Sequence, residues 1–154
     1  MAKLVLLFGL FVLPALAMAG PFQIHGSVYC DTCRCGFETE KTTYIAGARV
    51  RIECKDRVTL QLKYSVEGVT NSDGLYNILV EDDHEDQICQ AVLVDSPQID
   101  CNEADPGRSS SEIILTRYNG AISNVHFANS MGFFKDKALP GCKELVYKLL
   151  YSET

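Results

Sequence analysis

Seven cysteines in a chain of 154 residues constrain the fold of this protein more than any other feature of its sequence. Residues 1–19 give those cysteines a context. They combine an apolar run over residues 4–13 with the triplet Ala17-Met18-Ala19, the pattern of a cleavable export signal. A membrane-spanning helix would need about 20 apolar residues, and Pro14 interrupts this run. We therefore expect a secreted protein of residues 20–154, one domain in length, in an extracellular space where thiols oxidise.

The cysteines predict disulfide bonds that supplement a modest core. Their number is odd, so at least one thiol is free or bonded to another molecule, and spacing alone does not decide the pairs. Cys30-x-x-Cys33 has the spacing of a redox motif, but it ends a predicted strand, whereas a reactive thiolate is stabilised at a helix N-terminus. A zinc site of Cys30, Cys33, Cys35 and a histidine lacks the second closely spaced ligand pair that such sites use. The seven are Cys30, Cys33, Cys35, Cys54, Cys89, Cys101 and Cys142.

Alternating apolar residues predict an all-β fold with little helix. The clearest alternation covers residues 48–54, where Ala48, Val50, Ile52 and Cys54 share one face. Other strands are expected over residues 22–29, 58–69, 75–80, 88–94 and 112–115. Short strands separated by turn signals indicate a single antiparallel β-barrel or sandwich.

Three local signals refine this expectation. Asp73-Gly74 predicts a hairpin turn between the strands of residues 58–69 and 75–80, and Asn119-Gly120 predicts another turn. Gly26 inside the first strand suggests a bulge or a close backbone approach. Residues 143–151 fit a short helix better than a last strand.

The charged side chains exclude some classes of function and suggest one surface. The net charge of −6 argues against non-specific electrostatic binding of nucleic acid, which needs clustered basic residues. Residues 81–87 lack the glycine and the alternating ligands of a calcium loop, so we expect a solvated loop that can face a basic partner, and no metal or cofactor. Its acidic residues are Glu81, Asp82, Asp83, Glu85 and Asp86.

No motif for catalysis stands out. The Gly-x-Ser-x-Gly elbow is missing, and nothing singles out one pair of carboxylates as acid and base. Cys35 is the only candidate nucleophile that the sequence suggests. We therefore expect a protein that is not an enzyme, with thiol–disulfide exchange at Cys30, Cys33 and Cys35 as the alternative. Aromatic residues in a chain without tryptophan are expected mostly in the core, and this applies to Phe127, Phe133, Phe134, Tyr147 and Tyr151.

The run Gly26-Ser27-Val28-Tyr29-Cys30-Asp31-Thr32-Cys33-Arg34 resembles the signature of the plant pollen-allergen/extensin family, the Ole e I-like pollen proteins typified by the main olive pollen allergen. The resemblance extends over nearly the whole mature chain. It takes in Ile45-Ala46-Gly47-Ala48, Val50-Arg51-Ile52-Glu53-Cys54, Asp73-Gly74-Leu75-Tyr76, Glu85-Asp86 with Cys89, Gly132-Phe133-Phe134-Lys135, Leu139-Pro140 and Cys142.

The resemblance implies a small antiparallel β-barrel-like fold with six cysteines in three bridges. Carried onto this sequence, the bridges are Cys30 with Cys101, Cys33 with Cys142, and Cys54 with Cys89. Each is worth roughly 3–4.5 kcal/mol in a chain-entropy model. Cys35 is an additional cysteine, and His25 replaces the residue that the family usually carries before the glycine. Neither Asn71-Ser72-Asp73 nor Asn129-Ser130-Met131 completes a glycosylation motif, so no N-glycosylation site is expected.

The resemblance also implies a role. We expect a non-enzymatic protein of the extracellular space or apoplast, associated with pollen or pollen-tube growth, that acts as a signalling or adhesion ligand for a receptor-kinase ectodomain. The alternative is a structural or polysaccharide-binding cell-wall protein. We expect a monomer without a membrane span after signal cleavage, and a dimer linked through Cys35 is the other state considered.

Overall fold

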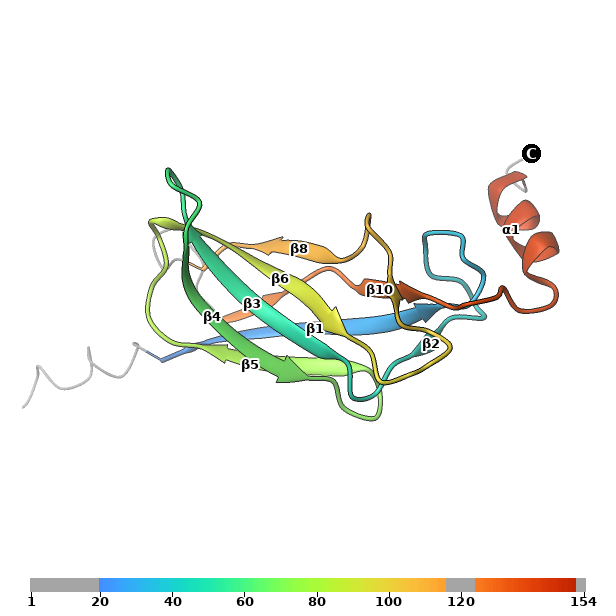
Figure 1. The fold of residues 1–154 in the computed structure, drawn as a ribbon, viewed down its shortest axis with the longest axis horizontal. Helices are drawn as coiled ribbons and strands as arrows, with labels where there is room; N and C mark the ends of the chain where they lie inside the picture. Colours follow the sequence, from blue (N-terminus) through green and yellow to red (C-terminus); the bar gives the residue numbers. More distant parts are fainter. Residues whose placement is uncertain (1–19, 116–123, 152–154) are drawn as a thin grey trace, which may run out of the picture.

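The computed structural model describes residues 20–115 and 124–151, and Figure 1 shows its ribbon. The expected export signal and the expected turn at Asn119-Gly120 lie outside the described residues. The described part is mostly β-structure with one helix, α1 (Cys142–Tyr151), which confirms the predicted class and the short C-terminal helix.

The long strand β1 (Phe22–Asp31) organises the first sheet because it pairs with four other strands. Its first half pairs antiparallel with β5 (Leu75–Val80) and parallel with β9 (Val125–Phe127). Its second half pairs antiparallel with β2 (Thr43–Tyr44) and parallel with β10 (Met131–Phe134). The two parallel pairs depart from the antiparallel arrangement expected from sequence. They require long crossovers, and the chain passes through the second sheet between β5 and β9.

The second sheet is fully antiparallel and has the order β4–β3–β6–β8. Its strands are β4 (Leu62–Val69), β3 (Arg49–Asp56), β6 (Gln87–Asp95) and β8 (Ser110–Ile113). The short strand β7 (Glu103–Ala104) pairs with β10 and so extends the first sheet. The described strands thus form two separate sheets and no closed barrel.

Side chains from both sheets meet in one core. The alternation predicted for β3 is confirmed, because Val50, Ile52 and Cys54 are fully buried while Arg49 is exposed. The facing contribution comes from β1, where Ile24 is also fully buried. Members of the core cluster include Phe22, Ile24, Val28, Val50, Ile52, Ile78, Val80, Ala91, Leu93, Ile113 and Phe133. Burial of such side chains supplies the dominant stabilising free energy of a domain.

The turn at residues 70–74 reverses the chain without making the expected hairpin. Gly74 has φ +76°, and the Asn71 side chain accepts hydrogen bonds from the N–H groups of Asp73 and Leu75 at 2.9 and 3.0 Å. However, β4 pairs with β3 whereas β5 pairs with β1 (Figure 1). The predicted hairpin is therefore wrong: the turn carries the chain from one sheet to the other.

The strand expected over residues 58–69 also begins later than predicted. β4 starts at Leu62, and Val58 and Leu60 lie in the connection from β3, where they are 90% and 61% exposed. Leu60 adopts φ +60° there, a conformation that interrupts the alternation of a strand. The apolar periodicity of the sequence runs on through this turn. Pattern alone does not distinguish hydrophobic residues at a hairpin tip from those of a strand, so the predicted strand starts too early.

Gly26 marks a close approach and no bulge. The register of β1 against β5 is continuous from Phe22 to Ser27. A Cβ atom at Gly26 would overlap the ring and hydroxyl group of Tyr76, the residue directly opposite on β5. Gly132 on β10 makes room for the Tyr29 ring in the same way. Because each glycine has no side chain, it leaves the space that a tyrosine ring on the neighbouring strand occupies.

Helix α1 stands at one end of the molecule, beyond the sheets (Figure 1). Cys142 is its only buried residue, whereas Tyr147 and Tyr151 are 67% and 64% exposed. The expectation that these tyrosines and Phe127 belong to the core is wrong, since Phe127 is 80% exposed; Phe133 is buried as expected. Among the described residues, no helix has the length and apolar content that a bilayer span requires.

Candidate functional site

Three disulfides fix the positions of the loops around the two sheets. Cys54 and Cys89 are directly opposite on β3 and β6 and are joined inside the core, with Cα atoms 4.1 Å apart. Cys30 at the end of β1 is joined to Cys101. Cys33 is joined to Cys142 at the start of α1, over a sequence separation of 109 residues. The structure therefore contains the same three pairs that the family resemblance implies, and Cys35 is free.

Asp31 organises the loop that contains the free cysteine. Its carboxylate is buried at the end of β1 and accepts hydrogen bonds from the N–H groups of Gly36 at 2.7 Å and Cys35 at 3.2 Å. The Cys35 thiol donates a hydrogen bond to the carbonyl oxygen of Phe37 at 3.3 Å. Burial raises the pKa of the Cys35 thiol above its usual value. A half-buried, protonated thiol is a poor nucleophile, so this loop is poorly suited to thiol–disulfide exchange.

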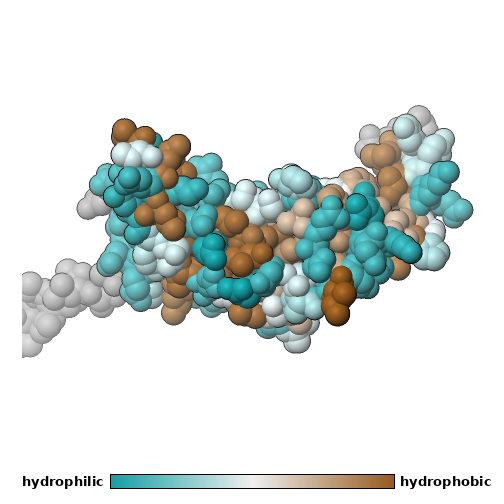
Figure 2. All heavy atoms as spheres, viewed as in Figure 1, coloured by the Kyte–Doolittle hydropathy of each residue, from teal (hydrophilic) through white to brown (hydrophobic). Residues whose placement is uncertain are grey.

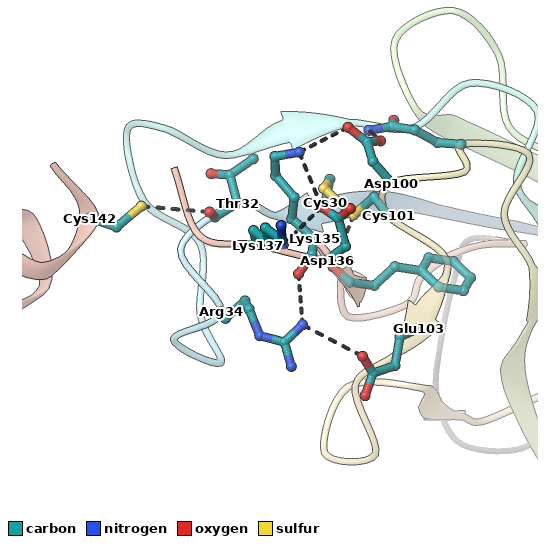
Figure 3. A network of polar contacts seen from close by, with 12 residues as sticks. Cys30, Thr32, Arg34, Asp100, Cys101, Glu103, Lys135, Asp136, Lys137 and Cys142 are labelled. Carbon is teal, nitrogen blue, oxygen red and sulfur yellow. Dashed lines mark hydrogen bonds and ion pairs between the residues drawn. A yellow bond between two sulfur atoms is a disulfide. The ribbon is translucent and has the colours of Figure 1, made fainter. Parts of the chain in front are cut away.

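A polar network connects the Cys33 loop to the late segments of the chain (Figure 3). The Arg34 guanidinium donates to the carbonyl oxygen of Lys135 at 2.7 Å and lies over the Phe134 ring at 4.9 Å from its centre. The same guanidinium is 3.5 Å from the Glu103 carboxylate. Lys135 in turn donates to the Asp100 carboxylate at 2.9 Å. These contacts brace the disulfide end of the molecule and occupy the charges of Arg34 and Lys135.

The acidic loop, residues 81–87, connects β5 to β6 and is held in place by His84. The imidazole of His84 is buried and lies between the carbonyl oxygen of Glu81 and the side-chain oxygen of Gln87, each 2.8 Å from a ring nitrogen. It also packs on the Tyr64 ring of β4, with ring centres 4.8 Å apart. The His84 backbone N–H donates to the carbonyl oxygen of Leu115 at 3.0 Å. The loop is therefore anchored from below by one histidine.

Four of the five acidic residues predicted as a binding surface lie on the outside of this anchored loop. Glu81, Asp82, Glu85 and Asp86 are exposed, and Asp83 is half-buried, with its carboxylate accepting the N–H of Glu85 at 2.8 Å. Asp82 adopts φ +65°, which aspartate tolerates better than most residues. The structure thus brings the five carboxylates to one end of the molecule.

An apolar hairpin tip, residues 57–61, lies beside the acidic loop. The Arg57 side chain donates to the carbonyl oxygen of Glu85 at 3.3 Å and so ties the two segments together. The Asp56 carboxylate caps the tip by accepting the N–H groups of Val58 and Thr59, both at 2.9 Å, and these bonds hold the pKa of Asp56 below its usual value. We call the acidic loop and the hairpin tip together the acidic end.

The acidic end and α1 are at opposite ends of the long axis, and each exposes apolar side chains (Figures 1 and 2). The charge run of the sequence indicates the acidic loop, but its apolar neighbour has no such signal, because the alternation through Val58 and Leu60 is typical of a strand. The signal that marks the tip is Asp56, whose carboxylate caps the turn that follows it. The acidic end can offer carboxylates for charge-assisted hydrogen bonds around a small hydrophobic contact.

Comparisons with known proteins agree with this architecture. The model of the family described as "Pollen protein Ole e 1 like" matches residues 20–150. "Protein DOWNSTREAM OF FLC" of Arabidopsis thaliana is 59% identical over 133 residues, which cover 86% of this chain and 81% of that protein. "Pollen-specific protein C13" of Zea mays is 48% identical over 128 residues, covering 83% and 75% of the two chains. "Anther-specific protein LAT52" of Solanum lycopersicum is 38% identical over 154 residues, covering 97% and 96%.

A solved structure shares the fold. The crystal structure of the major plantain pollen allergen Pla l 1 superposes with a TM-score of 0.72 at 31% sequence identity, covering 79% of this chain and 99% of that one. Three of these four names refer to pollen or to anthers, and none of the four names an enzymatic activity.

Proposed function

The chain belongs to the Ole e 1-like pollen protein family, and on that premise we propose that it is a secreted, pollen-related extracellular protein that works as a non-enzymatic recognition ligand. The pollen and anther names of its relatives support the setting, and the three disulfides support an oxidising extracellular location. We place its partner-binding surface at the acidic end and its partner at the cell surface.

The observation that carries this proposal is the combination of fixed carboxylates with an exposed apolar tip. The acidic loop is anchored through His84, so its backbone loses little conformational entropy when a partner binds. Val58 and Leu60 supply apolar area that is at least 61% exposed in the free protein. Apolar contacts of this kind contribute affinity, while the surrounding charges set partner choice and association rate.

The charge of the acidic end determines the kind of partner. Four of its five acidic residues are exposed, and the Arg57 guanidinium beside them is bonded to the backbone carbonyl oxygen of Glu85. The complementary surface is therefore basic, with an apolar recess for the hairpin tip. A receptor ectodomain with such a patch fits the proposed role, and binding should strengthen as ionic strength falls because exposed charges are screened over about 8 Å at physiological salt.

Binding of the labelled protein to pollen-tube cells tests this proposal. The double variant Glu85→Lys/Asp86→Lys reverses two exposed charges of the acidic loop, and Glu40→Lys/Asp73→Lys makes the same net change at exposed positions elsewhere. We expect the first variant to bind at least several-fold more weakly, with the larger loss at low salt, and the second to bind like the wild type. Equal binding of both variants and the wild type would remove the acidic end from the proposal.

The same assay distinguishes a cell-surface partner from a wall component. Binding is measured before and after enzymatic removal of the wall. Binding that survives on protoplasts supports a membrane receptor. Binding that disappears with the wall contradicts the ligand role and favours a structural role in the wall.

A further inference from the structure

An open depression of about 460 Å³ lies away from the acidic end. Sites for small ligands have volumes of about 300–1,000 Å³. Three segments meet at this depression: the loop before β8, the connection between β9 and β10, and the loop that crosses the end of β1. Its lining residues are Glu38, Gly107, Arg108, Ser110, Asn129 and Ser130. We call it the β8–β10 depression.

The walls of the depression are held by hydrogen bonds of backbone and serine hydroxyl groups. The Gly132 N–H donates to the carbonyl oxygen of Arg108 at 3.1 Å, which ties the loop before β8 to β10. The Asn129 N–H donates to the Ser111 hydroxyl at 2.9 Å, and the hydroxyl groups of Ser130 and Ser27 are 2.7 Å apart. The lining residues therefore keep their positions without using all their side-chain groups.

Two tyrosines orient the charged side chains of the depression. The Arg108 guanidinium donates one N–H to the Tyr29 hydroxyl at 3.3 Å, and Tyr29 is itself fully buried. The Tyr44 hydroxyl donates to one carboxylate oxygen of Glu38 at 2.9 Å. The other oxygen of Glu38 and the remaining N–H groups of Arg108 have no hydrogen-bond partner among the described residues, and neither do the Asn129 amide and the Ser110 hydroxyl.

The composition of this lining selects the class of ligand. One cation and one anion leave the depression without net charge, and the amide and hydroxyl groups both donate and accept hydrogen bonds. A lining that both donates and accepts hydrogen bonds suits a ligand whose neighbouring hydroxyl groups also donate and accept, as those of a sugar do. The Glu38 carboxylate and the net charge of −6 oppose a phosphate or a polyuronate. Tyr44 does not line the depression, but its hydroxyl is bonded to Glu38, and its ring is exposed enough for the C–H face of a sugar to pack on it.

We propose that the β8–β10 depression binds a neutral oligosaccharide. Arg108 and Glu38 contact ring hydroxyl groups from two sides, Asn129 and Ser110 bond to the next hydroxyl groups along the chain, and Tyr44 packs on one sugar face. The site uses no residue of the acidic end. The protein therefore has two recognition surfaces, and loss of one leaves the other intact.

Amide chemical-shift titration of the ¹⁵N-labelled protein tests this site. The probes are three neutral linear hexasaccharides, cellohexaose, mannohexaose and xylohexaose, with hexagalacturonate as the anionic comparison. We expect at least one neutral probe to shift the amides of Gly107, Arg108 and Asn129 with a dissociation constant below about 10 mM. Hexagalacturonate should shift them less.

Two variants locate the binding energy. Ser110→Ala/Asn129→Ala removes exposed groups whose side chains make no hydrogen bond to the described residues, so the fold should persist, and affinity for the active probe should fall about fivefold to tenfold. Ser65→Ala/Asn77→Ala makes the same changes on exposed positions of β4 and β5 and should bind like the wild type.

Three outcomes would overturn the proposal. One is the absence of shifts with all three neutral probes, and another is a set of shifts that maps to a different surface. The third is tighter binding of hexagalacturonate than of the neutral probes, which would make the depression an anion site. A loss of cell binding in the charge-reversal experiment at the acidic end has no bearing on these results, so the two proposals fail separately.

Discussion

The buried hydroxyl group of Tyr76 is a liability to the fold, and its removal should stabilise the protein. Tyr76 is 3% exposed, and its hydroxyl has no hydrogen-bond partner among the described residues. Leaving a buried polar group unpaired costs about 1–3 kcal/mol. Tyr76→Phe keeps the ring that packs across Gly26 and deletes only the unpaired group. We therefore expect the free energy of unfolding at pH 7 to rise by about 1 kcal/mol.

The same group predicts a difference at alkaline pH. Burial raises the pKa of Tyr76 from 10.0 to about 12. The unfolded chain then loses its proton before the folded one, so this titration leaves the free energy of unfolding unchanged below pH 10 and lowers it as the pH rises toward 12. The loss amounts to about 1.4 kcal/mol at pH 11 and approaches 2.7 kcal/mol above pH 12. A phenylalanine does not titrate, so Tyr76→Phe should lack this part of the pH dependence.

Urea unfolding between pH 7 and pH 11 measures both effects. All variants carry Cys35→Ser, because a free thiolate at high pH would exchange with the disulfides. Tyr147→Phe is the matched control, since Tyr147 is 67% exposed. The advantage of Tyr76→Phe over the wild type should grow with pH, whereas the control should follow the wild type throughout.

Two results would refute this reasoning. If Tyr76→Phe is less stable than the wild type at pH 7 by about 1 kcal/mol or more, the hydroxyl makes a favourable hydrogen bond in solution. If the stability curves of wild type and variant run parallel from pH 9 to pH 11, the folded and unfolded states release the Tyr76 proton together, and burial does not raise its pKa.

Three further outcomes are expected at other sites. Burial lowers the pKa of His126, so the unfolded chain gains its proton first, and unfolding midpoints in urea should fall as the pH drops below about 6.5; His126→Phe should flatten this dependence, and an unchanged slope would contradict it. The raised pKa of Cys35 predicts alkylation by iodoacetamide at pH 8 more slowly than free cysteine, and an equal or faster rate would show an exposed thiolate. Cys33→Ser/Cys142→Ser should lower the free energy of unfolding by about 4 kcal/mol or less. It should also expose α1 to rapid trypsin cleavage at Lys148, because Cys142 is the only buried residue of the helix. Unchanged cleavage kinetics would mean that α1 is held by other contacts.

Local features of the fold were predictable where the chain's own chemistry decides them. The alternation of β3 follows from a strand with one buried face, and the close approach at Gly26 follows from a missing side chain inside a strand. Residues 143–151 have the spacing of one apolar helical face, and α1 forms there. These predictions rest on neighbours in sequence, which a periodic pattern reports directly.

Partners distant in sequence were not predictable from patterns. The turn before β5 has the residues of a hairpin, but β5 pairs with β1, because the choice of partner depends on which sheet buries Tyr76 and Ile78. The exposure of Phe127 has a similar origin. It faces outward on β9 beside His25, with ring centres 5.6 Å apart, because its neighbour His126 faces the core side beside Phe22.

The two candidate sites differ in the same way: one is local in sequence, and the other is formed by distant segments. The acidic loop is one continuous run of sequence, so its charge was visible in advance, while its anchoring by His84 on Tyr64 of another strand was not. The β8–β10 depression had no sequence signal, because its lining comes from three segments spread between Glu38 and Ser130.

The class of this protein could be predicted from its residues alone: a run of acidic residues, alternating strands, an odd number of cysteines after an export-like segment, and a family signature around Cys30 and Cys33. The pairing of the strands, the exposure of particular aromatic residues and the convergence of polar groups from distant segments became visible only in the folded chain. The physical reason is that side-chain periodicity and turn chemistry are local properties. Strand partners and binding surfaces depend on the burial of one shared core by the whole chain.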